Sequence, residues 1–220
     1  KKKKKKKKIF FFLKKYFNSQ LDLLIQTKKR KIIPRSNNQK KYFQLLNEKN
    51  IVFAVGPAGT GKTFLAVAAA LHQVLEEKRY KRIVIVRSRD FMDEDPGFLP
   101  GDIREKSLPL LGGVTDALIS MHGEVGDDQA TAATVDHIME RANIEVTSLA
   151  YVRGRSFDDT CFIVDECQNL TRAQMKGVLS RGGTNCRTIL LGNLAQIDDK
   201  FVTPSSAGVS AAIYIYRNFD

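Results

Sequence analysis

The stretch IVFAVGPAGTGKT, residues 51–63, decides the fold of this chain. Its first five residues are an apolar run typical of a buried strand, and residues 64–77 show a helical pattern. The eight residues 56–63 fit G-x-x-x-x-G-K-[ST], a loop whose N–H groups bind phosphate at a helix N-terminus. Strand, loop and helix in this order predict a nucleoside triphosphate site. The alternative is a glycine-rich turn that matches by chance.

Each position of this loop has a predicted role. The lysine reaches the β- and γ-phosphates, and the hydroxyl that follows it ligates Mg²⁺. The residues expected to contact the nucleotide are Gly56, Pro57, Ala58, Gly59, Thr60, Gly61, Lys62 and Thr63, with Thr63 also a metal ligand.

Four further apolar runs alternate with helical patterns along the chain. The predicted strands cover residues 82–88, 144–149, 160–165 and 187–192. The predicted helices cover residues 36–47, 64–77, 104–121 and 131–142. This alternation predicts an α/β fold with a mostly parallel sheet and helices on both faces.

The strand at residues 160–165 ends in Asp165-Glu166. Open parallel sheets place ligands at the carboxyl ends of their strands, so both carboxylates are expected to point toward the phosphate loop. Asp165 is the predicted Mg²⁺ ligand, and Glu166 is the predicted base for an attacking water. A plain strand end is the alternative for this pair. Residues 192–198, GNLAQID, follow the last strand and are interpreted either as a sensor of the γ-phosphate or as an ordinary turn.

The net charge of +12 belongs to the N-terminal segment. Residues 1–41 hold 17 Lys or Arg and one acidic residue, which leaves −4 for residues 42–220. We therefore expect a basic, low-complexity and disordered tail over residues 1–33 and one nucleotide-binding domain over residues 34–220. Such a tail is either solvated or a nonspecific ligand of phosphate backbones and anionic membranes. The charge itself says nothing about the domain.

The chain shows no membrane or metal signal. No run approaches the roughly 18 apolar residues needed to span a bilayer, and residues 9–13 are too few for a signal peptide. Three cysteines have neither C-x-x-C spacing nor histidine partners. We expect a cytoplasmic protein without a membrane partner, in a reducing compartment.

The sequence resembles a known family. DECQN at residues 165–169, followed by GNLAQID, is similar to motifs of helicase superfamily 1. More specifically, the chain resembles the PhoH-like family of ATPases through GFLPGD at residues 97–102 and AYVRGR at residues 150–155, which generic P-loop proteins lack. The resemblance covers about residues 34–219. Cys167 stands where the family usually has Ala, and Asn193 stands where many members have Asp.

This resemblance implies a RecA/helicase-like P-loop fold that hydrolyses ATP with Mg²⁺ and couples this to RNA or DNA remodelling. It implies that Gln39 recognises the adenine edge. It also implies that Gln168, Asn193 and Gln196 lie near the γ-phosphate or the attacking water. Single-stranded nucleic acid and RNA are thus expected partners, although the core sequence shows no basic stripe or stacking aromatics. Arg153 and Arg155 match a segment that serves phosphates or a neighbouring subunit.

No arginine is clearly placed to stabilise the transferring phosphoryl group. Family members continue past residue 220 with an Arg-containing motif, so we expect the C-terminus to be incomplete. The arginine is then expected from that segment or from the next protomer of a homo-oligomeric ring. A nucleotide-gated oligomeric module with little turnover is one alternative. A small-molecule kinase is another, although Glu166 and the glutamines suit water activation better.

Overall fold

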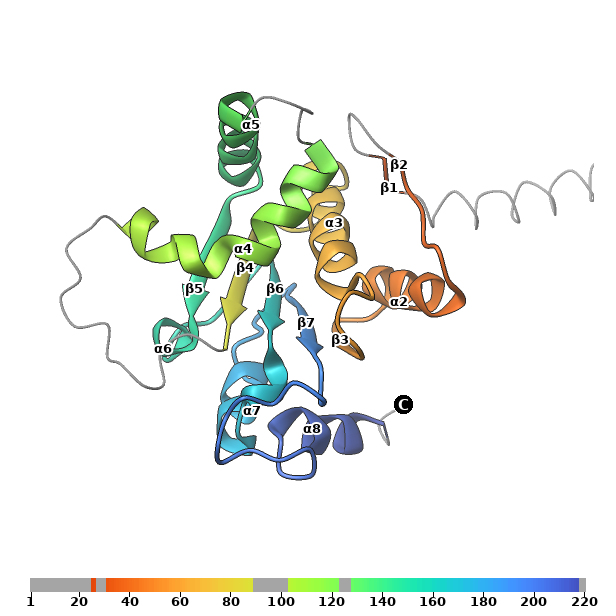
Figure 1. Ribbon diagram of the computed structural model, residues 1–220, viewed down its shortest axis with the longest axis vertical. Helices are drawn as coiled ribbons and strands as arrows, with labels where there is room; N and C mark the ends of the chain where they lie inside the picture. The colour runs from red at the N-terminus through yellow and green to blue at the C-terminus, as the bar shows by residue number, and fades with distance from the viewer. Residues whose placement is uncertain (1–24, 27–30, 89–102, 123–127, 218–220) are drawn as a thin grey trace, which may run out of the picture.

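A five-stranded parallel sheet organises the molecule. The computed structural model describes residues 25–26, 31–88, 103–122 and 128–217. Every strand pair of this sheet is parallel, and the strand order is β3-β7-β6-β4-β5 (Figure 1). The strands are β3 (Ile51–Val55), β4 (Arg82–Arg87), β5 (Ile144–Ser148), β6 (Thr160–Asp165) and β7 (Arg187–Gly192).

Helices cover both faces of this sheet. One face carries α2 (Asn37–Glu48), α3 (Lys62–Leu75), α4 (Ile103–His122) and α5 (Asp128–Arg141). The other carries α6 (Leu149–Val152), the 3-10 turn η1 (Cys167–Asn169), α7 (Arg172–Leu179) and α8 (Gly208–Tyr216). Two short antiparallel strands, β1 (Ile25–Gln26) and β2 (Lys31–Ile32), lie beside α3.

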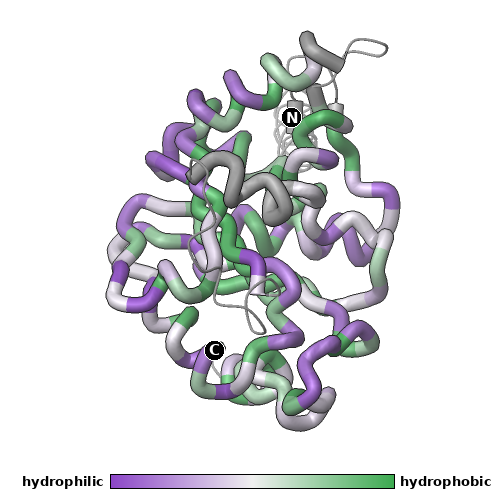
Figure 2. The backbone as a smooth tube through the Cα atoms, turned by 60° about the vertical axis from the view of Figure 1, so that its left-hand side comes forward, coloured by the Kyte–Doolittle hydropathy of each residue, from purple (hydrophilic) through white to green (hydrophobic). Residues whose placement is uncertain are grey.

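Alternation along each strand divides the core into two layers. Ile83 and Ile85 of β4 belong to the layer under α3, whereas Val84 and Val86 belong to the layer under α7. All four side chains are buried, and full burial of such a side chain stabilises the fold by about 1.5–3 kcal/mol. Figure 2 shows hydrophobic segments running through the middle of the molecule. These two layers confirm the predicted α/β fold with helices on both faces.

The predicted strands match the observed ones to within one residue at each end. The helices α7 and α8, in contrast, were not predicted. A capping box in which Thr171 and Gln174 satisfy each other's backbone N–H groups begins α7, and this helix is only eight residues long. The motif GFLPGD lies outside the described residues, as does most of the predicted tail.

The C-terminal end of α2 is fixed to the sheet by a buried arginine. Arg187, at the start of β7, is fully buried and donates to the carbonyls of Leu46 and Asn47, the latter at 3.0 Å. Gln73 of α3 also donates to the Leu46 carbonyl, at 3.0 Å. These bonds satisfy carbonyls that the helix itself leaves unpaired. They hold α2, whose other end carries Gln39, against α3.

None of the helices in the described ranges has the length and apolar character required to cross a membrane.

Candidate nucleotide-binding site

The loop between β3 and α3 adopts a conformation that requires glycine at two positions. Gly59 and Gly61 have φ angles of 71° and 82°, in the left-handed region. The N–H of Gly56 donates to the Gly192 carbonyl at 3.0 Å, which joins the loop to β7. Gly61 is the N-cap of α3, and no side chain caps this helix. The first N–H groups of α3 therefore remain available for an anion.

Lys62 is the first residue of α3. Its ammonium lies over the loop and donates to the carbonyls of Gly56 and Pro57 at 2.8 and 2.7 Å. Partial burial lowers the pKa of Lys62, and the carboxylates of Asp165 and Glu166 act in the opposite direction. The lysine thus lies within the electrostatic reach of both predicted acidic residues.

A cavity of 480 Å³ opens at the carboxyl edge of the sheet. It brings together residues from the loop, from the tip of β6 and from the turn after β7. The predicted residues that line it are Ala58, Gly59, Gly61, Lys62, Thr63, Asp165, Glu166, Asn193 and Gln196. Segments more than 100 residues apart therefore form one site.

Asp165 lies at the end of β6 and is half-buried. Burial raises the pKa of Asp165, and the neighbouring Glu166 raises it further. The Thr63 hydroxyl and the Asp165 carboxylate are hard oxygen donors on the same cavity wall, and such a set fits Mg²⁺, which prefers few protein ligands plus phosphate and water. A cation would also relieve the repulsion between the two carboxylates.

Glu166 has a backbone conformation that non-glycine residues rarely adopt. Its φ angle is 55°, and its N–H donates to Asp165 Oδ1 at 3.0 Å. The hydroxyl of Ser88, which follows β4, donates to the Glu166 carbonyl. Such strain persists where neighbouring contacts fix it, and it is concentrated at functional sites. Here the strained residue belongs to the acidic pair, and both members of the pair line the cavity.

Gln168 is fully buried and does not line the cavity. Its Nε2 donates to Glu166 Oε2 at 2.6 Å and to the Gln196 carbonyl at 2.9 Å. Its Oε1 accepts from the N–H of Asn193 at 3.0 Å. The amide therefore connects the Glu166 carboxylate directly to the turn after β7.

Asn193 and Gln196 form the cavity wall on that turn. Asn193 Nδ2 donates to Gln196 Oε1 at 2.7 Å, and Asn193 Oδ1 accepts from the N–H of Ala195 at 3.1 Å. Both side chains line the same cavity as Lys62. The turn is therefore ordered by its own polar groups at the wall of the cavity.

Gln39 lies on the other side of the loop. Its Oε1 accepts from the N–H of Arg35 at 2.6 Å, and its Nε2 donates to the Thr60 carbonyl at 3.1 Å. Each end of the amide retains capacity for one more hydrogen bond. Gln39 lines two further cavities of 470 and 710 Å³, and the first of these also contains Gly56, Pro57 and Thr60.

One side of the cavity is formed by residues that were not predicted from the sequence. Gly113, Asp116 and Ala117 of α4 line the 480 Å³ cavity opposite the loop. These positions are three and four residues apart, so the sequence could have shown that they share one face of a helix, but not what that face contacts. Only the packing of α4 against α3 shows that this face meets the cavity.

Arg155 is engaged within the domain. Its guanidinium makes a bidentate pair with Glu145 of β5, one bond of which is 2.9 Å long, and it lies over the Phe157 ring at 5.0 Å. Arg153, in contrast, is exposed. The two arginines of the AYVRGR segment therefore have different surroundings.

In this parallel sheet, β6 is the second strand from β3. The phosphate loop that follows β3 and the carboxylates at the end of β6 line the same cavity. This arrangement defines a P-loop nucleoside triphosphatase fold. The sequence matches the PhoH-like protein family over residues 31–220. The chain belongs to this family.

Individual relatives agree with this assignment. The chain is 42% identical over 164 residues to a PhoH-like protein of Bacillus subtilis, covering 74% of this chain and 49% of that protein. It is 38% identical over 202 residues to a PhoH-like protein of Mycobacterium leprae, covering 91% and 54%. It is 38% identical over 169 residues to Protein PhoH of Escherichia coli K12, covering 76% and 45%. The chain thus spans about half the length of these relatives.

Among solved structures, the UvsW helicase from bacteriophage T4 has a TM-score of 0.48 and 15% identity, covering 83% of this chain and 61% of that one. A likeness of this size adds nothing to the family assignment.

Proposed function

We propose that this domain binds ATP with Mg²⁺ and hydrolyses it. The observation that supports the proposal is the single cavity lined by Lys62, Thr63, Asp165 and Glu166. A lysine and free helix N–H groups suit phosphates, and hard oxygen donors suit Mg²⁺. Bound Mg²⁺ supplies charge neutralisation across the phosphates.

Glu166 is the proposed general base. One of its carboxylate oxygens accepts from Gln168, which leaves the other free to accept a proton from a water. A carboxylate fixed in this way loses little freedom when it orients that water. Lys62 stabilises the charge on the transferring phosphoryl group, for which it must exchange its loop carbonyls for phosphate oxygens.

Gln39 is proposed to recognise the adenine edge. Its amide is fixed by Arg35 and Thr60, and it faces a 710 Å³ cavity with the apolar side chains of Ile32 and Phe64. An adenine presents one acceptor and one donor that match the remaining capacity of the amide. The apolar walls suit the two faces of the base.

The proposed output is movement of the turn after β7. Asn193 and Gln196 would contact the γ-phosphate, and Gln168 would transmit their displacement to Glu166. Lysine is the only cation that lines the cavity among the described residues, so we propose that a neighbouring protomer of a homo-oligomer supplies an arginine. Coupling to RNA or single-stranded nucleic acid in the cytoplasm completes the proposal.

The test is steady-state phosphate release from ATP with Mg²⁺, with Lys62→Ala compared against Lys49→Ala. Lys49 is exposed at the end of α2, so it is a matched loss of one cation outside the site. We expect the first variant to lose about 10²–10³-fold in rate and the second to keep the parental rate. Equal rates in all three proteins would overturn the proposal.

A further inference from the structure

Two of the cavities at the candidate site share one stretch of wall. The 480 Å³ cavity is lined by Lys62 and the acidic pair, and the 710 Å³ cavity is lined by Gln39. Gly59, Gly61 and Phe64 line both cavities. A Cβ atom at Gly61 would lie 3.3 Å from Gln39 Nε2, so the shared wall is next to the amide proposed to recognise adenine. The two cavities therefore meet at this wall.

The helix α4 contributes to both cavities. Gly113, Asp116 and Ala117 line the 480 Å³ cavity. Ser120 and Met121, one turn further along the helix, line the 710 Å³ cavity. Four residues of helix rise by about 6 Å, so Asp116 and Ser120 lie close together on one side of α4. Because α4 packs against α3, this side of α4 passes from one cavity to the other.

A bound nucleoside triphosphate would span both cavities. Its phosphates are proposed to lie by Lys62 and Thr63, and its base is proposed to lie by Gln39. The ribose joins the base to the phosphates, so it would lie where the two cavities meet. Asp116 and Ser120 are the polar side chains that α4 places on either side of this junction.

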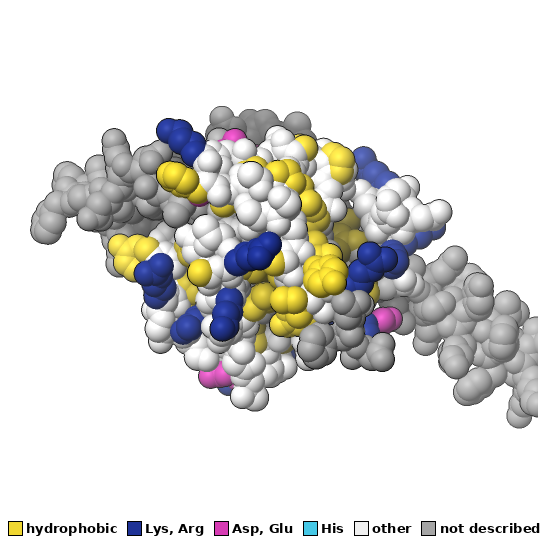
Figure 3. Space-filling view, turned by 90° about the horizontal axis from the view of Figure 1, so that it is seen from below, with side chains coloured by type: hydrophobic (Ala, Val, Ile, Leu, Met, Phe, Trp, Pro, Cys, Tyr) yellow, Lys and Arg dark blue, Asp and Glu magenta, His cyan; other side chains and the backbone are white. Residues whose placement is uncertain are grey.

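The Asp116 carboxylate has no partner within the described part of the chain. It is exposed, and it forms neither an ion pair nor a hydrogen bond with another described residue. No three His, Cys, Asp or Glu side chains among the described residues are placed to hold one metal ion, so Asp116 does not converge with the acidic pair. On the described surface at the carboxyl end of the strands, Asp and Glu side chains are few and scattered (Figure 3). Asp116 is thus not one member of a general acidic surface.

The chemistry of a carboxylate at this junction selects its ligand. Nearby phosphates repel it, and hydrogen-bond donors or a cation must offset that repulsion. An ionised carboxylate has two acceptor oxygens and no donor, and a ribose presents two adjacent hydroxyl donors. The same pairing of a carboxylate with a ribose hydroxyl occurs in dinucleotide-binding folds. Phosphate oxygens, in contrast, offer no donor to a carboxylate.

We propose that Asp116 binds the ribose of the nucleotide and makes the site selective for ribonucleotides. One carboxylate oxygen accepts from the 2′-hydroxyl, and the other accepts from the 3′-hydroxyl. A deoxyribose lacks one of these donors, so one carboxylate oxygen loses its hydrogen bond. This inference rests on the proposed binding of ATP and adds the sugar that the same site selects.

The experiment measures the Kd values of ADP, 2′-deoxy-ADP and 3′-deoxy-ADP by titration calorimetry with the full chain and Mg²⁺. Diphosphates are used because they carry the same ribose and have no γ-phosphate to be hydrolysed. The parent should bind both deoxy analogues about tenfold or more weakly than ADP, since each lacks a hydrogen bond to a charged group. The basic segment 1–41 attracts all three nucleotides alike, so it leaves the ratio of the Kd values unchanged.

The variant that tests the contact is Asp116→Ala. It should bind the three diphosphates with similar Kd values, so that the ratio of deoxy to ribo Kd falls from about ten to about one. A substitution that only perturbed the fold would weaken all three nucleotides alike and keep the ratio. Glu140→Ala removes an exposed carboxylate from α5, and Ile119→Ala removes an exposed side chain of α4 that lines neither cavity. Both controls should keep the parental ratio.

Three outcomes would overturn the assignment of Asp116. The first is equal Kd values of the parent for ADP and its deoxy analogues, and the second is a parental ratio in Asp116→Ala. The third is a loss of affinity in Asp116→Ala that is equal for the three nucleotides and disappears without Mg²⁺, because Asp116 would then be a metal ligand.

Phosphate release from ATP by the parent, measured in parallel, separates these failures from failure of the proposed function. A parent that neither binds ADP nor releases phosphate refutes the proposed function, and the ribose contact with it. A parent that binds ADP and releases phosphate, but gives one of the three outcomes, refutes the ribose contact alone.

Discussion

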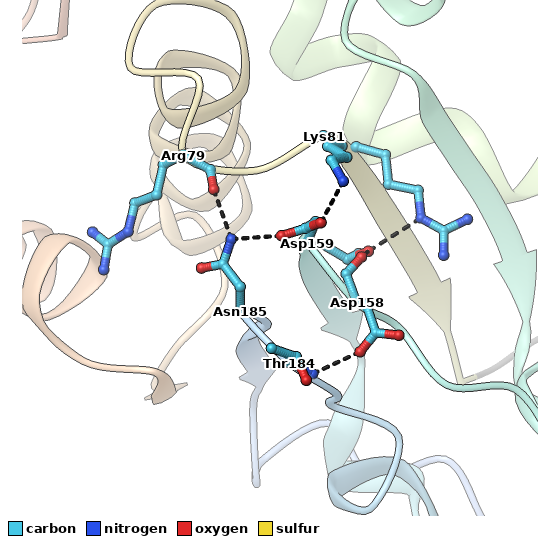
Figure 4. Close-up of polar contacts among 8 residues, drawn as sticks. Arg79, Lys81, Asp158, Asp159, Thr184 and Asn185 are labelled. Atoms are coloured by element: carbon cyan, nitrogen blue, oxygen red, sulfur yellow. Dashed lines mark hydrogen bonds and ion pairs between the residues drawn. The ribbon is translucent and has the colours of Figure 1, made fainter.

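The two edges of the sheet use the same residue types for opposite purposes. At the amino edge, Lys81 pairs with Asp159 at 2.6 Å, and Asn185 donates to Asp159 at 2.9 Å (Figure 4). Asn185 also donates to the Arg79 carbonyl at 3.0 Å, so each polar group has a partner within the chain. At the carboxyl edge, Lys62, Asp165 and Glu166 instead face a cavity. The groups at the carboxyl edge also have hydrogen-bond partners within the chain, but unlike those at the amino edge they line a cavity large enough for a ligand.

The two aspartates show this difference in their protonation. The hydrogen bond from Lys81 lowers the pKa of Asp159, with help from Asn185. Burial raises the pKa of Asp165, and Glu166 raises it further. The fold thus favours the ionised form of Asp159 and disfavours the ionised form of Asp165. Ionised Asp165 therefore lowers the stability of the fold at the edge of the sheet where a ligand is expected.

The largest expected effect is on catalysis at the carboxyl edge. Glu166→Gln should lower kcat for ATP hydrolysis by about 10²–10⁴-fold, because the amide cannot accept the proton of the water. The new amide can still accept from Gln168, so the fold and the Kd for ATP should remain close to parental values. Rapid-quench hydrolysis and a nucleotide-binding titration measure both. If mutant and parent hydrolyse alike, the role assigned to Glu166 fails.

The next effect is on stability away from the site. Arg187→Met should lower the free energy of unfolding by roughly 2–3 kcal/mol, since the last carbonyls of α2 lose a buried donor. Urea denaturation measures this change. Arg172→Met, the same substitution at an exposed position of α7, is the control and should change stability by less than about 0.5 kcal/mol. Equal losses in the two variants would contradict the structural role of Arg187.

A stabilising substitution is expected at the site itself. Asp165→Asn should raise the unfolding free energy without Mg²⁺ by about 1 kcal/mol at pH 7 while removing Mg²⁺ binding. The pKa of Asp165 is raised in the folded state. Below the unfolded-state pKa, near 4, the carboxyl is protonated in both states and costs the parent no stability. As pH rises through the folded-state pKa, ionisation of the half-buried carboxyl lowers the unfolding free energy of the parent. The gain should therefore disappear in acid. Urea midpoints across pH test this, and a loss of stability at pH 7 would refute it.

The opposite sign is expected for a carboxylate that the fold satisfies. Glu145→Gln should lower stability at pH 7 by about 0.5–1 kcal/mol, a value reduced because the pair with Arg155 is partly exposed. The hydrogen bond from Arg155 lowers the pKa of Glu145, so its contribution is present above the unfolded pKa and is lost as pH falls through the folded value. Parent and variant should converge in acid. A difference that stays constant as pH falls, with no convergence, would mean that packing, and not charge, is lost.

The sequence predicted the fold well where the signals are local. Apolar runs mark four of the five strands, the β-branched residues of IEVTS mark β5, and the glycine pattern marks the phosphate loop. The helix α8 was not predicted because its sequence, GVSAAIYIY, has no polar face to give it helical periodicity. Arg187 was interpreted only as the first residue of a strand, because its partners on α2 lie about 140 residues earlier.

The sequence indicated which polar residues lie near the cavity, but it did not indicate which of them contact each other. Gln168 was expected near the phosphate by resemblance, and the structure shows it buried between Glu166 and the turn after β7. The roles of Glu166, Gln168 and Gln39 in catalysis and binding stay predictions. Asp116 was not predicted because it lies on α4, about 50 residues after the phosphate loop, and no sequence pattern near the loop indicates that α4 lines the cavity.

By itself, the sequence determined the phosphate loop, the strands and the family, because each is written in consecutive residues whose conformation follows from local chemistry. The tertiary structure decided which side of α4 meets the cavity and which arginine is buried. The physical reason is the parallel topology. Each crossover returns the chain to the same edge, so groups tens of residues apart become neighbours there although no local pattern links them.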